Sequence, residues 1–292
     1  MSATQSTTAT DPCGSTTGHI AVTSFDPAID RARVTWTAGD FGRIAAGYAS
    51  GAAAFVDRLQ LVPGETVLDV ACGNGNLSLP AARQGAAVTG IDIAPNLIEA
   101  ACRACAAESL AIRFDVGAAE ALPYGDGAFD TVVSMFGVMF SGRPEAALAE
   151  LLRVTRPGGR IALANWMPDG FTGAMLRAHT AFVPPPPGWP PALAWGNETV
   201  MRERLAVHCD RIRSVAFVPR TIDLAFPLSP GGVVELFREF YGPTVRTFAA
   251  LDAEERATLT ATLARLWESR TDASRGMTSV AAEYLEVLIE RK

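Results

Sequence analysis

From about residue 65 onward, short apolar runs alternate with longer amphipathic stretches. The short runs are apolar throughout, which is typical of strands that are buried on both faces of a sheet. Strands that alternate with helices of this length indicate βαβ units and a parallel sheet with helices on both faces. We predict strands at 66–71, 87–93, 111–116, 129–136, 160–166, 212–226 and 277–289.

The amphipathic stretches carry apolar residues at helical spacing. We predict helices at 41–61, 77–85, 95–108, 144–156, 230–248 and 252–270. Residues 277–289 would also suit a helix by periodicity, although we interpret them as the last strand. The pattern therefore predicts an α/β fold: a doubly wound, seven-stranded, mostly parallel sheet with a helical insertion near the C-terminus.

The alternation of strands and helices stops after residue 166. Four consecutive prolines in "VPPPPGWPP" exclude both a helix and a central strand, so this segment is expected to form a rigid extended cover. We predict one domain over residues 25–292, with insertions at about 166–210 and 228–272. The Ser/Thr-rich residues 1–24 are expected to form a flexible tail.

Composition and charge exclude several classes of protein. Apolar residues make up 49% of the chain, but no apolar stretch approaches the ~20 residues that a membrane span needs. The first residues lack the basic and apolar parts of a signal peptide, so a cytoplasmic location is expected. A net charge of −6 argues against a protein that binds a nucleic-acid backbone. The five cysteines are irregularly spaced. Cys102 and Cys105 lie on one expected helix, where packing is the preferred interpretation, and no metal is predicted.

The stretch "VLDVACGNGNLS" (67–78) ends a predicted strand with an acid and a glycine-rich turn. In a doubly wound sheet this first turn is the usual ligand contact, and Gly73 and Gly75 let the backbone approach a ligand closely. Asp92, 23 residues beyond Asp69, ends the next strand, where a carboxylate can accept hydrogen bonds from two ribose hydroxyls. A nicotinamide dinucleotide stays open at this point, as do a simple tight turn and a helix cap at Asp92. However, Asp69 would repel a pyrophosphate and attract an ammonium or a sulfonium.

Four motifs in order resemble those of class I S-adenosylmethionine-dependent methyltransferases, nearest to the ubiquinone/menaquinone-biosynthesis type. They are "VLDVACGNGN", "GIDI", "EALPYGDGAFDTVVSMFGVMF" and "LLRVTRPGGRIALANW". The resemblance covers about residues 36–185 and implies S-adenosyl-L-methionine as the cofactor. The cofactor residues that it implies are Asp69, Ala71, Gly73, Asn74, Gly75, Asp92, Ile93, Ala118, Ala119, Glu120, Ser134 and Met135.

The resemblance assigns parts of the cofactor to these residues. The turn and Asp69 would hold the methionine end, and Asp92 the ribose. Ile93 and residues 118–120 would lie along the adenine. Two positions depart from the family pattern: Ala71 replaces its first glycine, and Ala118 stands where an acid often contacts the adenine amino group.

The acceptor pocket is expected to lie between the segment before the first strand, the ends of the fourth and fifth strands, and the two insertions. We predict an aromatic and apolar lining, with packing in the core as the alternative for each residue: Trp36, Phe41, Phe136, Met139, Trp166 and Phe240, with Phe171, Trp189, Trp195, Phe237 and Tyr241 as further candidates. His179 and Tyr241 are candidate catalytic bases, although His179 also suits an exposed or capping position.

The activity expected from this resemblance is methyl transfer to N, O or C of a small aromatic or apolar molecule, in bacterial specialised metabolism. Methyltransferases of exocyclic amines carry N-P-P-Y or D-P-P-Y after the fourth strand. This chain has "SMFGVMF" there instead, so exocyclic amines are not the expected targets. A use of the same fold without methyl transfer, as a pericyclase- or decarboxylase-like enzyme or a regulatory subunit, stays as the alternative. A nicotinamide oxidoreductase is a more distant one. The protein is expected to be a monomer or homodimer without nucleic-acid or membrane partners.

Overall fold

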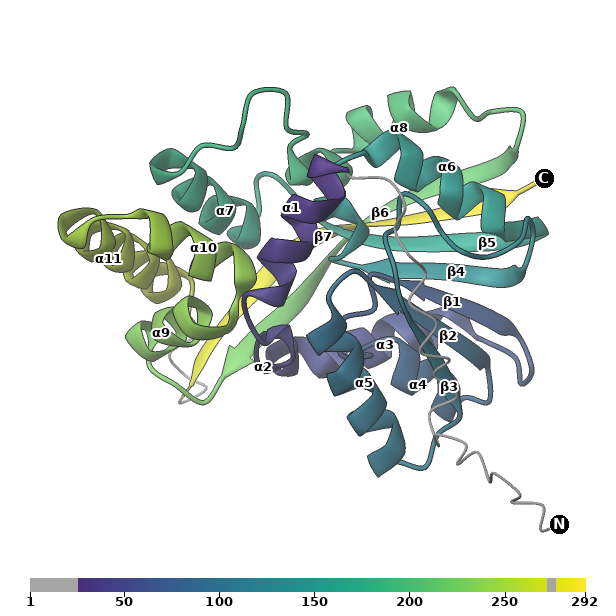
Figure 1. Ribbon diagram of the computed structural model, residues 1–292, viewed down its shortest axis with the longest axis horizontal. Coiled ribbons are helices and arrows are strands. Elements are labelled where there is room, and N and C mark those ends of the chain that lie inside the picture. Colours follow the sequence, from purple (N-terminus) through teal and green to yellow (C-terminus); the bar gives the residue numbers. More distant parts are fainter. Residues whose placement is uncertain (1–25, 272–276) are drawn as a thin grey trace, which may run out of the picture.

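The computed structural model describes residues 26–271 and 277–292, so the tail predicted at 1–24 lies outside the described residues. Its centre is a seven-stranded sheet in the order β3-β2-β1-β4-β5-β7-β6, as Figure 1 shows. The strands are β1 (Thr66–Val70), β2 (Ala87–Asp92), β3 (Ile112–Val116), β4 (Phe129–Met135), β5 (Thr155–Trp166), β6 (Ile212–Phe226) and β7 (Thr278–Arg291). The seven predicted strands are therefore confirmed, including β7.

Strands β1 to β5 are parallel, and β7 runs antiparallel to both β5 and β6. The strand order reverses at β1, which has β2 on one side and β4 on the other. Residues Val67 to Val70 are buried because helices cover the central strands. In such a sheet the ligand crevice lies beyond the carboxyl ends of the strands at the reversal point. The fold therefore predicts the ligand site at the carboxyl ends of β1, β2 and β4.

The helices connect these strands and fill the two insertions. They are α1 (Pro27–Thr37), α2 (Phe41–Ala45), α3 (Ala49–Leu59), α4 (Ser78–Arg83), α5 (Pro95–Ala107), α6 (Pro144–Val154), α7 (Phe171–Phe182), α8 (Glu198–Ala206), α9 (Pro230–Phe240), α10 (Gly242–Ala250) and α11 (Ala253–Arg270). In the described part of the chain, no helix is long and apolar enough to cross a membrane.

Two of the predicted helices are interrupted. The helix predicted at 230–248 divides at Tyr241, whose backbone is extended, into α9 and α10. Pro243 lies in the first turn of α10, where its missing N–H is tolerated and where it ends any helix that arrives from before it. The helix predicted at 41–61 becomes α2, a 3₁₀ turn at Ala46–Tyr48, and α3. Helices α1 and α8 were not predicted.

The C-terminal insertion rests on an extension of the sheet. Strand β7 pairs with β5 over residues 284–290 but with β6 along almost its whole length, so the two long strands continue past the parallel part of the sheet. Helices α7, α9, α10 and α11 gather at this end, on the left of Figure 1. Helix α1 packs against α10 so closely that a Cβ on Gly242 would lie 2.2 Å from the Thr35 carbonyl oxygen. This packing holds α1 beside the ends of the parallel strands.

Candidate cofactor and substrate site

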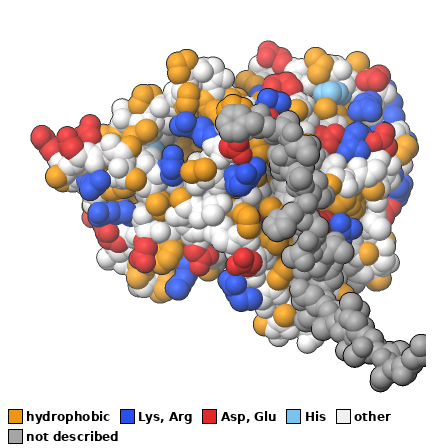
Figure 2. Space-filling model, viewed as in Figure 1, with side chains coloured by type: hydrophobic (Ala, Val, Ile, Leu, Met, Phe, Trp, Pro, Cys, Tyr) orange, Lys and Arg blue, Asp and Glu red, His pale blue; other side chains and the backbone are white. Residues whose placement is uncertain are grey.

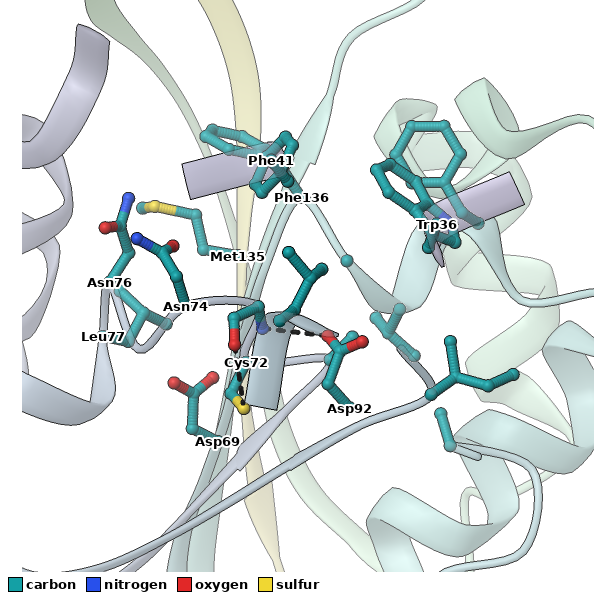
Figure 3. Close-up of a pocket in the computed structure, with 18 of the residues that line it drawn as sticks. Trp36, Phe41, Asp69, Cys72, Asn74, Asn76, Leu77, Asp92, Met135 and Phe136 are labelled. Atoms are coloured by element: carbon teal, nitrogen blue, oxygen red, sulfur yellow. Dashed lines mark hydrogen bonds between the residues drawn. The ribbon is translucent and has the colours of Figure 1, made fainter. Parts of the chain in front are cut away.

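A cavity lies at the carboxyl ends of β1, β2 and β4 and is bordered by α1 and α2. Its empty space, counted together with the open mouth, is about 850 Å³. Figure 3 shows part of its lining. The lining residues are Ala32, Trp36, Phe41, Tyr48, Asp69, Ala71, Cys72, Gly73, Asn74, Asn76, Leu77, Asp92, Ile93, Leu97, Gly117, Ala119, Glu120, Met135, Phe136, Gly137, Val138, Phe140 and Ser141.

Two buried carboxylates end neighbouring strands in this cavity. Asp92 accepts hydrogen bonds from the backbone N–H groups of Gly73 and Ala94, both at 2.9 Å. Asp69 accepts one from the Ser78 hydroxyl at 2.6 Å. Burial raises the pKa of Asp69 to about 7 and that of Asp92 to about 6, and the nearby charge of Asp92 adds to the shift at Asp69.

The lining contains no arginine, lysine or histidine from the described part of the chain. The two carboxylates are therefore not neutralised by a basic side chain in the cavity. A ligand that brings a positive charge and hydroxyl groups would compensate them, because a buried carboxylate needs an opposite charge or hydrogen-bond donors.

These pKa shifts predict how stability depends on pH. The pKa of each carboxyl in the folded protein lies above its ordinary value of 3.8, so the native state binds more protons than the unfolded chain between about pH 4 and about pH 7. Stability falls as the pH rises through this window. In thermal unfolding scans, the midpoint of the ligand-free wild type should fall relative to that of Asp69→Asn as the pH is raised from about 5 to about 8. Parallel profiles would contradict the shift at Asp69.

The backbone of the turn after β1 is shaped for close approach to a ligand. Ala71 and Gly73 have φ values of 55° and 57°, in the left-handed region that glycine adopts readily. The Asn74 Oδ1 atom is buried and has no hydrogen-bond partner in the described part of the chain. An unpaired buried acceptor is unfavourable, so this atom is well suited to a ligand N–H group.

Nine of the twelve predicted cofactor residues line the cavity: Asp69, Ala71, Gly73, Asn74, Asp92, Ile93, Ala119, Glu120 and Met135. Gly75, Ala118 and Ser134 do not. The Ser134 hydroxyl is used inside the sheet, where it donates to the Val70 carbonyl at 2.7 Å and accepts from the Val138 N–H at 3.1 Å. Ser134 therefore shapes the site by joining the ends of β1 and β4.

Glu120 lines the cavity, but its carboxylate already has partners. It accepts hydrogen bonds from the Ser141 hydroxyl at 2.6 Å and from the Gly142 N–H at 3.1 Å. These contacts tie the segment after β3 to the segment after β4. Glu120 therefore forms part of the cavity wall, and its carboxylate already accepts two hydrogen bonds.

The predicted substrate residues divide into two groups. Trp36, Phe41 and Phe136 line the cavity, whereas Met139, Trp166 and Phe240 do not. Trp166 lies behind Phe136, with the two rings stacked at a centroid distance of 3.4 Å.

The other two residues have partners away from the lining. Met139 is buried in the core, and its neighbour Phe140 faces the cavity instead. The Phe240 ring packs under the guanidinium of Arg43 at 5.2 Å. In the described part of the chain, no lining residue of this cavity comes from 166–210 or 228–272, so the role of the two insertions in acceptor binding stays a prediction.

The two candidate bases lie outside the cavity. The His179 ring is buried between α7 and α10, with Nδ1 2.7 Å from the Met175 carbonyl oxygen and Nε2 2.9 Å from the Thr244 hydroxyl. Both nitrogens are occupied, and burial lowers the pKa of this histidine. Tyr241 packs behind the lining, with its ring 5.9 Å from that of Trp36 and 6.1 Å from that of Phe41. This geometry does not support a base role for His179.

His179 is instead expected to stabilise the protein. His179→Gln should lower the free energy of unfolding by about 1–3 kcal/mol, because it disturbs two buried hydrogen bonds. It should leave the turnover of the folded enzyme unchanged. Urea unfolding and initial rates, measured on the same preparation, test both statements. A hundredfold slower reaction in a folded variant would restore the base role.

The structure also adds site residues that the sequence pattern did not single out. Tyr48, Asn76, Leu97 and Phe140 line the cavity. Asn76 belongs to the same turn as Gly73, so its place in the glycine-rich turn could have identified it as a site residue from the sequence. Cys102 and Cys105 lie on α5, and the described residues contain no group of three side chains that could hold a metal ion.

The sheet order, the two acids at the strand reversal and the glycine turn define a Rossmann-like α/β protein that binds a cofactor. Comparisons with known proteins agree with this class. A family model described as a methyltransferase domain matches residues 67–159. The chain is 33% identical over 255 residues to the uncharacterized protein Rv1405c of Mycobacterium tuberculosis, covering 87% of this chain and 88% of that protein.

Two further comparisons cover the named enzymes and the solved structures. The chain is 40% identical over 117 residues to a demethylmenaquinone methyltransferase of Thermus thermophilus, covering 39% of this chain and 53% of that enzyme. A putative methyltransferase structure from Bacillus halodurans matches with a TM-score of 0.56 at 17% identity, covering 82% of this chain and 98% of that one. The chain belongs to the class I S-adenosylmethionine-dependent methyltransferases, and S-adenosyl-L-methionine is its cofactor.

Proposed function

We propose that this methyltransferase modifies N, O or C of a small aromatic or apolar molecule. The proposal rests on how charged and apolar side chains are distributed over the cavity lining. Its charged side chains, Asp69, Asp92 and Glu120, come from the segments assigned to the cofactor. Apart from Ser141, the remaining lining is apolar, aromatic or amide, with five aromatic rings: Trp36, Phe41, Tyr48, Phe136 and Phe140. Such a surface favours a flat or apolar acceptor.

The absence of basic residues from the described lining disfavours acceptors that carry phosphates, since these need positively charged or other strong donors. The name of one relative is consistent with a small-molecule acceptor. By its name, the Thermus thermophilus relative acts on demethylmenaquinone, a quinone, although the chain spans about half of that enzyme.

The cofactor supplies a methyl group that is already activated on a sulfonium. We infer that Asp92 accepts hydrogen bonds from the ribose hydroxyls, while Asp69 and Asn74 compensate the ammonium of the methionine end. The aromatic walls exclude water and hold the acceptor. Alignment of this kind can contribute ~7–11 kcal/mol toward lowering the barrier, so a general base is not required for every acceptor.

The test uses methyl-labelled S-adenosylmethionine and an extract of the source organism, separated into low-mass, RNA and protein fractions. The purified enzyme should transfer label to the low-mass fraction, and the labelled product should partition into an organic solvent. Label in RNA or protein would contradict the proposed acceptor class. Cofactor binding without label in any fraction would favour the non-methylating use of the fold.

A further inference from the structure

Among the described residues that line the cavity, Tyr48 is the one tyrosine. The residue ends the 3₁₀ turn between α2 and α3 and is 4% exposed. Its ring meets that of Phe136 edge to face at a centroid distance of 5.6 Å and lies 6.4 Å from that of Phe41. The hydroxyl is therefore a polar point within the aromatic part of the lining.

Within the described residues, the Tyr48 hydroxyl donates no hydrogen bond of ordinary length. The Asn76 amide donates one hydrogen to the Ala45 carbonyl at 3.3 Å. The same amide lies close enough to Tyr48 to lower the pKa of the phenol, although burial outweighs this effect. The O–H of Tyr48 can therefore donate to a further group.

The surroundings keep Tyr48 protonated. Burial raises the pKa of this phenol, with smaller contributions in the same direction from Tyr241 and Asp69. A neutral phenol in a dry lining is a hydrogen-bond donor, and leaving that donor unpaired is unfavourable.

We infer that Tyr48 selects acceptors whose ring carries an oxygen, because its O–H donates to that oxygen and fixes the ring among Phe41 and Phe136. This inference rests on the proposed function and narrows its substrate class from aromatic molecules to oxygenated ones. Tyr48 is thus a specificity-determining residue for the acceptor and not a ligand of the cofactor.

The test compares two probes of the same shape, 2-naphthol and 2-methylnaphthalene, which differ by a hydroxyl in place of a methyl group. Their affinities are measured by fluorescence titration of the enzyme saturated with S-adenosylhomocysteine. The wild type should bind 2-naphthol about tenfold more tightly than 2-methylnaphthalene, as one buried hydrogen bond implies. Tyr48→Phe should bind both probes equally, with an unchanged dissociation constant for S-adenosylmethionine.

Tyr124→Phe is the matched control, because its hydroxyl binds Asp115 at 2.9 Å outside the cavity and its loss should leave the probe preference intact. Three results would overturn the inference: no probe preference in the wild type, a preference that persists in Tyr48→Phe, or a tenfold loss of cofactor affinity in that variant. The comparison of the two probes on the wild type does not depend on whether a variant folds. Transfer of label to a low-mass acceptor is measured separately, so failure of the proposed function and failure of this inference are distinguishable.

Discussion

Asp92→Ala is expected to bind S-adenosylmethionine ten- to a hundredfold more weakly than the wild type. The carboxylate ends β2 inside the cavity and would accept charge-assisted hydrogen bonds from the ribose hydroxyls, which contribute ~1.5–3 kcal/mol. Asp92 also accepts the N–H groups of Gly73 and Ala94, so its loss loosens the turn that contacts the methionine end. Calorimetric titration at about pH 8 measures the change with the wild-type carboxylate ionised.

Asp115→Ala is the matched control for this experiment. Asp115 ends the next strand of the sheet and is also largely buried, but it contacts Arg113 and Tyr124 outside the cavity. Its removal should leave cofactor affinity within about twofold of the wild type, since it touches no group assigned to the cofactor. Equal affinity of folded Asp92→Ala and the wild type would remove Asp92 from the cofactor site.

Phe136→Ala is expected to lower the free energy of unfolding by about 3–5 kcal/mol, the range for large aromatic side chains in a core. The ring is 3% exposed and is stacked on Trp166, with the rings of Tyr48 and Tyr284 edge-on at 5.6 Å. Phe136 is also an acceptor wall, so the variant should lose acceptor affinity as well. Urea unfolding followed by tryptophan fluorescence measures the stability change.

The backbone at Phe136 supplies an internal comparison. Its φ of 56° is unfavourable for any residue with a Cβ, and such strain is found at functional sites. Phe136→Gly should therefore be about 1 kcal/mol more stable than Phe136→Ala, the reverse of the usual order within regular structure. A glycine variant less stable than the alanine variant would show that the strain is not relieved in this way.

The centre of the sheet was predictable because strands such as β1 and β4 are buried on both faces and consist of almost continuous apolar runs. The prediction of β7 was harder, since residues 277–289 also have helical periodicity, and pairing with β5 and β6 decides the structure. The missed helix α1 had a local signal: Asp26 caps it and Pro27 stands in its first turn. The break before Pro243 likewise follows from elementary helix chemistry.

The cofactor side of the site was more predictable than the acceptor side. Asp69 and Asp92 are brought together by strand order, which the βαβ pattern specifies. Whether an aromatic ring lines the cavity or packs behind it depends on tertiary packing. Phe136 and Trp166 illustrate this, because one ring lies directly on the other and only Phe136 lines the cavity in the described part of the chain.

The measurement that tests the central claim most directly is the conversion of S-adenosylmethionine to S-adenosylhomocysteine, followed by mass spectrometry. We expect the wild type to form S-adenosylhomocysteine when the low-mass fraction of the extract is added and not in its absence. At a cofactor concentration well below the dissociation constant of the wild type, Asp92→Ala should be at least tenfold slower. If the wild type binds the cofactor but leaves it unconverted with every fraction, the protein does not use this site for methyl transfer.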